Sequence, residues 1–478
     1  MSSPRLAVIG GGLAGVSAAL TAVDAGADVV LFERRSRLGG LTWSFRRHGL
    51  WFDNGQHVFM RCCTAYRGFL DRIGAGDQVT LQPGLEVPVL APGGISSSIT
   101  RTNLPAPLHL LGSLARYRFL SVGERARLAL AVLPMRHLDP DDPALDAITF
   151  GQWLADHGQS GRAIERLWDL ITLPTVNVPA AEASLAMAIK VFRTGLLDST
   201  DGGDIGWSQV PLRQLHGDNA SQALSAAGVE VRLESRVEGL ARSADSGWVV
   251  STPEGPDRVD AVIVATPPEV VATLVPEGTL PAIEGLGASP IVNVHLVLDR
   301  RVTDLPMAAG VGTPIQFLFD RTASSGVQEG QCLAISLSAA DTYVGQRPEE
   351  LVRSFRQALD DLLPSARHAR LIDGTVSREH AATFRAVPGT AALRPSALTG
   401  LPGLAVAGAW CDTGWPATME GAVRSGQSAV SAVLDGVNEE HSAGGKQHPA
   451  GGKPSIGGKN SIGDEDSGPA PQLQGVRQ

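Results

Sequence analysis

Lysine, tyrosine and cysteine are scarce in this chain, and each shortage narrows what the protein can do. Lys190 is the only lysine before the C-terminal tail, and the 478 residues include three tyrosines and four cysteines. The cysteines, at positions 62, 63, 332 and 411, lack the spacing of a metal site, and a disulfide between the adjacent pair would be strained. We therefore expect free thiols in a reducing compartment and no bound metal.

Long apolar runs are missing too. Charged residues interrupt every stretch long enough to span a bilayer, and no basic-then-apolar leader opens the chain, so we expect neither a membrane-spanning helix nor a signal peptide. The formal net charge of −9 argues against nucleic acid as a partner. We expect a cytoplasmic protein, with peripheral attachment to the inner face of the cytoplasmic membrane as an alternative.

The first 33 residues have the pattern of a dinucleotide-binding unit. A buried strand is predicted over 6–9, a helix over 16–25 and a second strand over 28–32. A glycine-rich loop joins the first strand to the helix, so a diphosphate would lie at the helix N-terminus, where free N–H groups and the helix dipole favour negative charge.

Each glycine of this loop has a mechanical role in such a unit. Gly10 permits the tight turn, Gly12 lets the backbone approach the diphosphate, and Gly15 lets the helix pack on the strand. Glu33, at the end of the second strand, would accept the adenosine ribose hydroxyls. Its carboxylate would repel a 2′-phosphate, so the predicted nucleotide is not NADP-like.

The segment from Glu33 to Gly40 resembles the E-x-x-x-R-x-G-G extension of the amine oxidase and phytoene desaturase superfamily of FAD proteins. The resemblance implies that Arg37 meets the diphosphate and that Gly39 and Gly40 pass under the ribityl chain. A guanidinium suits the first role because it grips phosphate oxygens in a bidentate way, and glycine suits the second because it lets backbone crowd a ligand. The alternative is a solvated arginine-rich loop.

A second motif near the C-terminus is typical of a flavin site. A strand over 403–408 precedes a loop, and a helix is predicted to start near Glu420. Asp412 is placed to accept a ribityl hydroxyl, while the helix N-terminus would stabilise the anionic reduced flavin. We expect non-covalent FAD, since no cysteine or histidine stands in an attachment motif. The predicted cofactor-binding residues are Gly10, Gly12, Leu13, Ala14, Gly15, Glu33, Arg34, Arg37, Gly39, Gly40, Leu41, Val237, Ala265, Gly408, Asp412, Thr418, Met419, Gly421 and Ala422.

The runs from Thr413 to Gly426 and from Phe52 to Val58 narrow the resemblance. They are similar to the squalene-associated FAD-dependent desaturases, which are hydroxysqualene dehydroxylases of bacterial hopanoid pathways. The resemblance implies reductive removal of an allylic hydroxyl from hydroxysqualene, giving squalene and water while reduced FAD is oxidised. Ala409 stands where an acid is expected, so Asp412 would carry the ribityl role alone.

Loss of an allylic hydroxyl needs an acid, and two residues are candidates. His57 follows the Phe52–Gln56 run that the resemblance places against the flavin; the alternative is a histidine satisfied by backbone in a tight turn. Glu420 is the second candidate, although a helix N-terminus favours its ionised form. The predicted substrate-lining residues are Trp43, Gln56, Trp410 and Trp415. The indole faces of the three tryptophans could stabilise positive charge on the substrate. The alternative is that these tryptophans are ordinary core residues.

The predicted fold is α/β, with a Rossmann-type FAD-binding domain interleaved with an α+β substrate domain, as in the amine oxidase and phytoene desaturase superfamily. The segments assigned to the FAD-binding domain are 1–75, 206–285 and 390–435. The substrate domain takes 76–205 and 286–389. The tail over 436–478 is rich in Gly, Ser and charged residues, and we predict that it is disordered.

Residues 108–135 mix leucines with arginines at helical spacing. A basic amphipathic helix pair could lie on a membrane surface and admit a lipid, but a core helix with a charged outer face produces the same pattern. The predicted partners are a hydrophobic polyisoprenoid substrate, a membrane surface and prenyl synthase-like proteins.

Three other functions compete with the dehydroxylase. A carotenoid or phytoene desaturase would run the same flavin over a similar polyene in the oxidising direction. An amine oxidase is disfavoured, because it needs an aromatic cage rich in tyrosine and often a lysine near the flavin. The non-enzyme alternative is a flavin-free scaffold that binds prenyl synthases.

Overall fold

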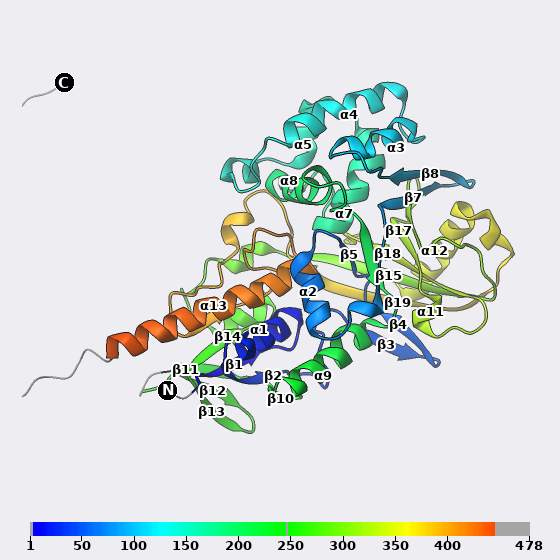
Figure 1. Ribbon diagram of the computed structural model, residues 1–478. Coiled ribbons are helices and arrows are strands. Elements are labelled where there is room, and N and C mark those ends of the chain that lie inside the picture. Colours follow the sequence, from blue (N-terminus) through cyan, green and yellow to red (C-terminus); the bar gives the residue numbers. More distant parts are fainter. Residues whose placement is uncertain (1–2, 245–246, 445–478) are drawn as a thin grey trace, which may run out of the picture.

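A five-stranded parallel sheet joins three distant parts of the sequence at one end of the molecule (Figure 1). The computed structural model describes residues 3–244 and 247–444. The strands follow the spatial order β10-β2-β1-β14-β20. Their bounds are β1 Arg5–Ile9, β2 Asp28–Phe32, β10 Glu230–Arg232, β14 Ala261–Val264 and β20 Leu404–Val406. The predicted Rossmann-type α/β fold is confirmed.

Two helices from opposite ends of the chain pack together on this sheet. They are α1 (Leu13–Asp24) and α13 (Met419–Gly444), which share an apolar core with alternate residues of β1. Gly426 of α13 makes the approach close, because a Cβ there would lie 2.2 Å from the Ala14 carbonyl oxygen. The Ser17 hydroxyl donates to the Val423 carbonyl over 3.0 Å. The glycine-rich loop and the C-terminal motif therefore meet at one edge of the sheet.

A seven-stranded sheet of mixed direction forms the second half, in the order β19-β15-β18-β17-β16-β7-β8. Its bounds are β7 Glu86–Ala91, β8 Ile95–Thr100, β15 Ser289–Leu298, β16 Met307–Gly310, β17 Phe317–Asp320, β18 Gln331–Leu337 and β19 Leu371–Thr383. Helix α12 (Pro348–Leu362) packs its apolar face on this sheet through Leu351, Phe355 and Leu359.

Shorter elements link and cover the two sheets. The small strands are β3 Ser44–Arg47, β4 Leu50–Asp53, β5 Val58–Met60, β6 Val79–Leu81, β9 Ile205–Ser208, β11 Gly239–Arg242, β12 Trp248–Thr252 and β13 Gly255–Val259. The helices are α2 Thr64–Arg72, α3 Leu111–Arg116, α4 Val122–Met135, α5 Phe150–Asp156, α6 Gly161–Ala163, α7 Asp169–Val176, α8 Leu185–Phe192, α9 Asn219–Ala226, α10 Pro268–Leu274 and α11 Thr322–Ser325. Among the described residues, no helix is long and apolar enough to cross a membrane.

The predicted start of the disordered tail at residue 436 is wrong. Helix α13 continues to Gly444, because a helix already packed on the sheet extends at little cost through good helix formers such as Glu439 and Glu440. The rest of the predicted tail, 445–478, lies outside the described residues.

Candidate flavin site and the adjoining cavity

The glycine-rich loop after β1 is held in a shape that side chains would prevent. Gly10 has φ +109°, and a Cβ there would lie 2.4 Å from the carbonyl oxygen of Ala265, just after β14. A Cβ on Gly15 would lie 1.8 Å from the Gly10 carbonyl oxygen. These contacts seat the loop on β14 and the first turn of α1 on the loop, as the fingerprint predicts.

The N-terminus of α1 is left bare. Gly12 is its N-cap, no side chain caps the first turn, and no acidic residue stands in it. Gly40 comes so close that a Cβ there would lie 2.8 Å from the Gly12 Cα. Two side-chain-free loops therefore meet at a helix N-terminus with free N–H groups, which fits a diphosphate.

Glu33 and Arg37 lie beside these loops. The buried Glu33 carboxylate accepts the Gly11 N–H over 2.7 Å and the Arg35 N–H over 2.8 Å. A carboxylate has lone pairs left after two bonds, so it can still accept a ribose hydroxyl. Arg37 donates from Nη1 to the Gly40 carbonyl over 3.4 Å, and partial burial lowers its pKa. Arg34 is exposed.

The loop after β20 is organised by Arg394, a residue that the sequence analysis missed. Its buried guanidinium donates from Nη2 to the carbonyls of Cys411 (2.5 Å) and Trp415 (2.7 Å). Its Nη1 lies 3.9 Å from Asp412 Oδ1, and burial lowers its pKa. Asp412 itself is exposed and accepts the Gly414 N–H over 3.0 Å, so its carboxylate remains accessible to a ligand.

Two buried hydroxyls in this region have no hydrogen-bond partner among the residues that the structure describes. They are Thr413 Oγ1, in the loop before α13, and Thr266 Oγ1, beside Gly10 at the end of β14. Buried polar groups are normally paired, so unpaired ones next to a bare helix terminus fit a polar ligand. The residues present fit FAD.

The other predicted cofactor residues are distributed around these loops. Thr418 Oγ1 accepts the Gly421 N–H over 3.2 Å and caps α13, and the Gly408 N–H donates to Ser425 Oγ over 2.9 Å. The remaining ones are Leu13 and Ala14, buried on α1; Gly39, buried before Gly40; Leu41, exposed; Val237, buried; and Met419 and Ala422, in the first turn of α13.

Glu420 does not have the surroundings of a catalytic acid. Its carboxylate accepts the backbone N–H groups of Ala65 (3.1 Å) and Tyr66 (2.7 Å) in the first turn of α2, and the Arg424 guanidinium over 2.6 Å. It is 1% exposed. These contacts cap α2 and engage both carboxylate oxygens within the protein, which is a structural role and not the predicted acid role.

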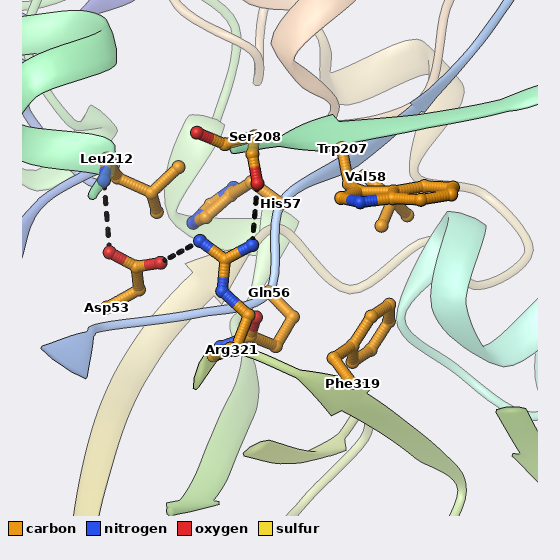
Figure 2. Close-up of a pocket in the computed structure, with 9 residues that line it drawn as sticks. All are labelled: Asp53, Gln56, His57, Val58, Trp207, Ser208, Leu212, Phe319 and Arg321. Atoms are coloured by element: carbon orange, nitrogen blue, oxygen red, sulfur yellow. Dashed lines mark hydrogen bonds and ion pairs between the residues drawn. The ribbon is translucent and has the colours of Figure 1, made fainter. Parts of the chain in front are cut away.

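A small cavity lies where the two halves meet (Figure 2). Its lining comes from the end of β4 and the segment after it, from β5, from β9 and the segment after it, and from β17 and the residue that follows it. The lining residues are Asp53, Gln56, His57, Val58, Trp207, Ser208, Leu212, Phe319 and Arg321. His57 and Gln56, two of the predicted site residues, are thus brought together here.

Arg321 and Asp53 form a buried ion pair in the cavity wall. Arg321 Nη2 donates to Asp53 Oδ2 over 2.8 Å, and its Nη1 donates to the Ser208 carbonyl over 2.7 Å (Figure 2). The other Asp53 oxygen accepts from Ser44 Oγ (2.6 Å) and from the Leu212 N–H (3.0 Å). Both Asp53 oxygens therefore have protein partners, whereas the buried Arg321 Nε has none among the described residues.

His57 is the remaining titratable group of the lining. Burial lowers its pKa, and Arg321 lowers it further, against the opposite effect of Asp53 and Glu379. His216 contributes to its surroundings, since His57 is one cause of the lowered pKa of His216. The His57 ring is thus neutral at pH 7.

Asn54 connects this cavity to the flavin loops. Its Nδ2 donates to the Leu41 carbonyl (2.7 Å) and its Oδ1 accepts the Trp43 N–H (3.0 Å). Its own carbonyl accepts from Asn293 Nδ2 (3.0 Å) and Ser377 Oγ (2.8 Å) on the large sheet. Asn54 was not predicted as a site residue. Its position between Asp53 and Gly55 in the Phe52–Val58 motif is the feature of the sequence that could have indicated a role at the site.

The three tryptophans predicted to line the substrate site, Trp43, Trp410 and Trp415, contact protein groups and do not line the small cavity. Arg37 lies 4.6 Å from the Trp43 ring centroid, and Arg424 and Lys190 lie 5.1 and 5.9 Å from that of Trp415. The buried Trp410 donates from Nε1 to the Thr266 carbonyl over 3.1 Å. Protein cations and core packing engage these rings, while Trp207 and Phe319 are the aromatic residues that line the small cavity.

The geometry agrees with a comparison against known families. The model of the flavin containing amine oxidoreductase family matches residues 13–434. The chain belongs to this family. It is therefore a flavin-dependent oxidoreductase, as the motifs at its two ends predicted.

The proteins that this chain resembles in sequence include some named for two different reactions. Hydroxysqualene dehydroxylase from Sinorhizobium fredii is 28% identical over 90% of this chain and 98% of its own length. The protein of the same name from Zymomonas mobilis is 27% identical over 89% and 98%. Zeta-carotene desaturase from Zea mays is 25% identical over 91% and 84%.

Solved structures of other proteins share the fold. Cyclohexylamine oxidase from Brevibacterium oxydans superposes with a TM-score of 0.67 at 20% identity, over 92% of this chain and 100% of its own. Putrescine oxidase bound to putrescine superposes with a TM-score of 0.65 at 18% identity, over 91% and 99%. Similarity at this identity shows the fold alone.

Proposed function

We propose that the protein uses non-covalently bound FAD to reduce hydroxysqualene to squalene, with loss of the allylic hydroxyl as water. The observation that carries the proposal is the position of His57 in the Phe52–Val58 segment, which Asn54 ties to the Leu41 carbonyl beside the flavin loops. Burial lowers the pKa of His57, and the neighbouring Asp53 and Arg321 form an ion pair. The two hydroxysqualene dehydroxylases, which align over nearly their whole length, support it.

The proposed reaction needs a proton donor, a hydride donor and protection from bulk water. The C–O bond breaks as His57 delivers a proton to the departing hydroxyl, which leaves as water. The hydride for the new C–H bond would come from reduced FAD held by the glycine loops and the N-terminus of α13. Trp207, Phe319 and Leu212 line the small cavity beside His57 and would limit the contact of its ring with bulk water.

The lowered pKa of His57 has a consequence for this role. Only the protonated imidazole is a strong acid, and burial keeps that form in the minority at pH 7. Dehydroxylation should therefore become faster as the pH falls from 8 to about 6.

Different residues of the site would hold different parts of FAD. The bare backbone at Gly12 and Gly40 would hold the diphosphate, with Arg37 beside it, and Glu33 would hold the ribose of adenosine. The N-terminus of α13 would face the flavin ring.

A carotenoid-type desaturase is the second candidate, because zeta-carotene desaturases match as large a share of this chain at 24–25% identity. It would use the same flavin to remove hydrogen from a polyisoprenoid. The two reactions need opposite redox states of the enzyme at the start.

Product identification tests the proposal. Purified enzyme reduced with dithionite is incubated with hydroxysqualene in detergent, and the extract is analysed by gas chromatography and mass spectrometry. We expect squalene, and no squalene when the flavin starts oxidised. Desaturated product from phytoene or zeta-carotene with oxidised enzyme, and no squalene, would favour the second candidate.

A further inference from the structure

Helix α4 carries apolar side chains on both of its faces. Leu128, Ala131 and Met135 are buried against the rest of the protein. Val122, Leu130 and Leu133 are 75%, 55% and 57% exposed. A surface helix normally presents polar side chains to water, so the outward face of α4 has the composition of a buried surface.

The turn and helix that precede α4 add to this surface. Leu104, Leu108 and Leu111 are 52%, 51% and 61% exposed, and α3 packs against α4. Figure 1 shows both helices at the edge of the molecule farthest from the parallel sheet. We call the set of Leu104, Leu108, Leu111, Val122, Leu130 and Leu133 the leucine face. It holds half of the strongly exposed large apolar side chains among residues 3–244 and 247–444.

The charge around the leucine face is opposite in sign to that of the chain. The formal net charge of the whole chain is −9, yet between residues 101 and 138 the only acid is Glu124. The six arginines in this segment are Arg101, Arg116, Arg118, Arg125, Arg127 and Arg136. Glu124 is neutralised by the Arg162 guanidinium.

We propose that the leucine face docks on an anionic phospholipid surface, with its leucines in the acyl boundary and Arg116, Arg118 and Arg127 at the headgroups. These three arginines are exposed. Apolar side chains bordered by cations match the layering of an anionic bilayer surface. A second copy of the chain fits less well, because a twofold contact would bring the arginines of both copies together.

The leucine face rests on a rigid base, so substitutions on it should leave the fold intact. Ser121 and Glu124 form a capping box at the start of α4. The Tyr117 hydroxyl donates to the Arg166 carbonyl over 2.7 Å, and Gln159 Nε2 donates to the Arg127 carbonyl over 2.8 Å. None of these contacts uses a side chain of the leucine face.

Co-sedimentation with vesicles tests this docking without substrate, so its result is independent of the proposed reaction. The full-length protein is mixed with phosphatidylglycerol–phosphatidylcholine vesicles and with pure phosphatidylcholine vesicles at low and high salt. One variant combines Leu111→Gln, Leu130→Gln and Leu133→Gln. Its control combines Leu233→Gln, Ile372→Gln and Leu398→Gln, three comparably exposed apolar positions elsewhere.

We expect the wild type and the control to bind anionic vesicles equally, and the leucine-face variant to bind at least about ten-fold more weakly. A third variant, Arg116→Gln with Arg118→Gln and Arg127→Gln, should lose roughly five-fold per arginine on anionic vesicles only. Wild-type protein that ignores anionic vesicles would overturn the proposal, as would equal binding by all variants. A lipid-free dimer that the leucine-face variant abolishes, with no vesicle binding, would assign the surface to a second copy instead.

Discussion

Arg321 donates a hydrogen bond to Asp53 over 2.8 Å, and neither side chain is more than 10% exposed. Asp53 ends β4, in the part of the chain that leads from the flavin loops, and Arg321 follows β17 of the large sheet. The ion pair therefore fixes the two halves of the molecule relative to each other at the cavity that holds His57.

Removing one member of this pair should be costly. Arg321→Met leaves the Asp53 carboxylate buried without its cation, and we expect a loss of about 3–5 kcal/mol in the free energy of unfolding. Urea denaturation measures it. The matched control is Arg72→Gln, which breaks the exposed pair with Asp24 and should cost less than about 1 kcal/mol. Equal losses in the free energy of unfolding would show that the buried pair stabilises the fold no more than the exposed pair does.

A methyl group between the two glycine loops should expel the cofactor. In Gly40→Ala the new Cβ would lie 2.8 Å from the Gly12 Cα, so the loops must separate where the diphosphate would bind. Gly49→Ala is the control, since Gly49 also has positive φ (+84°) but open space around it. We expect Gly49→Ala to be purified yellow and Gly40→Ala to lack visible flavin absorbance. Full flavin content in both would place the cofactor elsewhere.

Stability should fall as the pH drops from 6.5 to about 4. Burial lowers the pKa of His295 to about 4 and that of His216 to about 3, from an ordinary value of 6.5. Between these values the unfolded chain binds more protons than the folded one, so each histidine contributes a loss of up to about 1.4 kcal/mol per pH unit of acidification.

Urea denaturation at pH 7 and pH 5.5 checks this slope in His295→Gln and in Val294→Ala, a buried neighbour that does not titrate. The first variant should reduce the slope and the second should lower stability equally at both values. An unchanged slope in His295→Gln would contradict the assignment of a buried neutral ring.

Arg394 should hold the flavin loop through its planar fork. Arg394→Lys keeps a cation but has a single donor nitrogen. It cannot replace both the Nη2 bonds to the Cys411 and Trp415 carbonyls and the Nε bond to the Trp410 carbonyl (3.4 Å), so at least one buried carbonyl loses its donor, at a cost of about 1–3 kcal/mol. We expect flavin affinity to fall by about ten-fold or more, measured by recovery of flavin fluorescence on dilution. Arg385→Lys, at a partly exposed ion pair with Glu182, is the control and should leave affinity unchanged.

The flavin loops could be predicted from the sequence because their chemistry is local. Gly10, Gly12 and Gly15 lie within six residues of one another in the chain. Their spacing alone specifies a turn, a helix N-terminus without a side-chain cap and a close helix–strand contact. The C-terminal loop was predictable in outline for the same reason. Arg394 was missed, although it is the only charged residue between Arg385 and Asp412, which is a usable signal of a buried guanidinium.

The cavity could not be predicted, because its lining is assembled from strands far apart in sequence. Trp207 and Phe319 stand in ordinary strand patterns, and nothing local brings either residue near His57. Glu420 was misassigned because the α2 backbone it caps lies more than 350 positions away. Trp43 and Trp415 were predicted to line the substrate site because they stand in cofactor motifs. In the structure Arg37 lies over the Trp43 ring and Arg424 lies over the Trp415 ring, contacts that the sequence does not reveal.

The most direct test of the proposed chemistry is an anaerobic single turnover followed by flavin absorbance. Reduced wild-type enzyme and the His57→Asn variant, each with a full complement of flavin, are mixed with hydroxysqualene between pH 6 and pH 8. We predict that wild-type flavin reoxidises in step with squalene formation, faster at low pH, and that His57→Asn is slow and insensitive to pH. Flavin that stays reduced in the presence of hydroxysqualene, but is reduced from its oxidised form by phytoene or zeta-carotene, would contradict the reductive dehydroxylase.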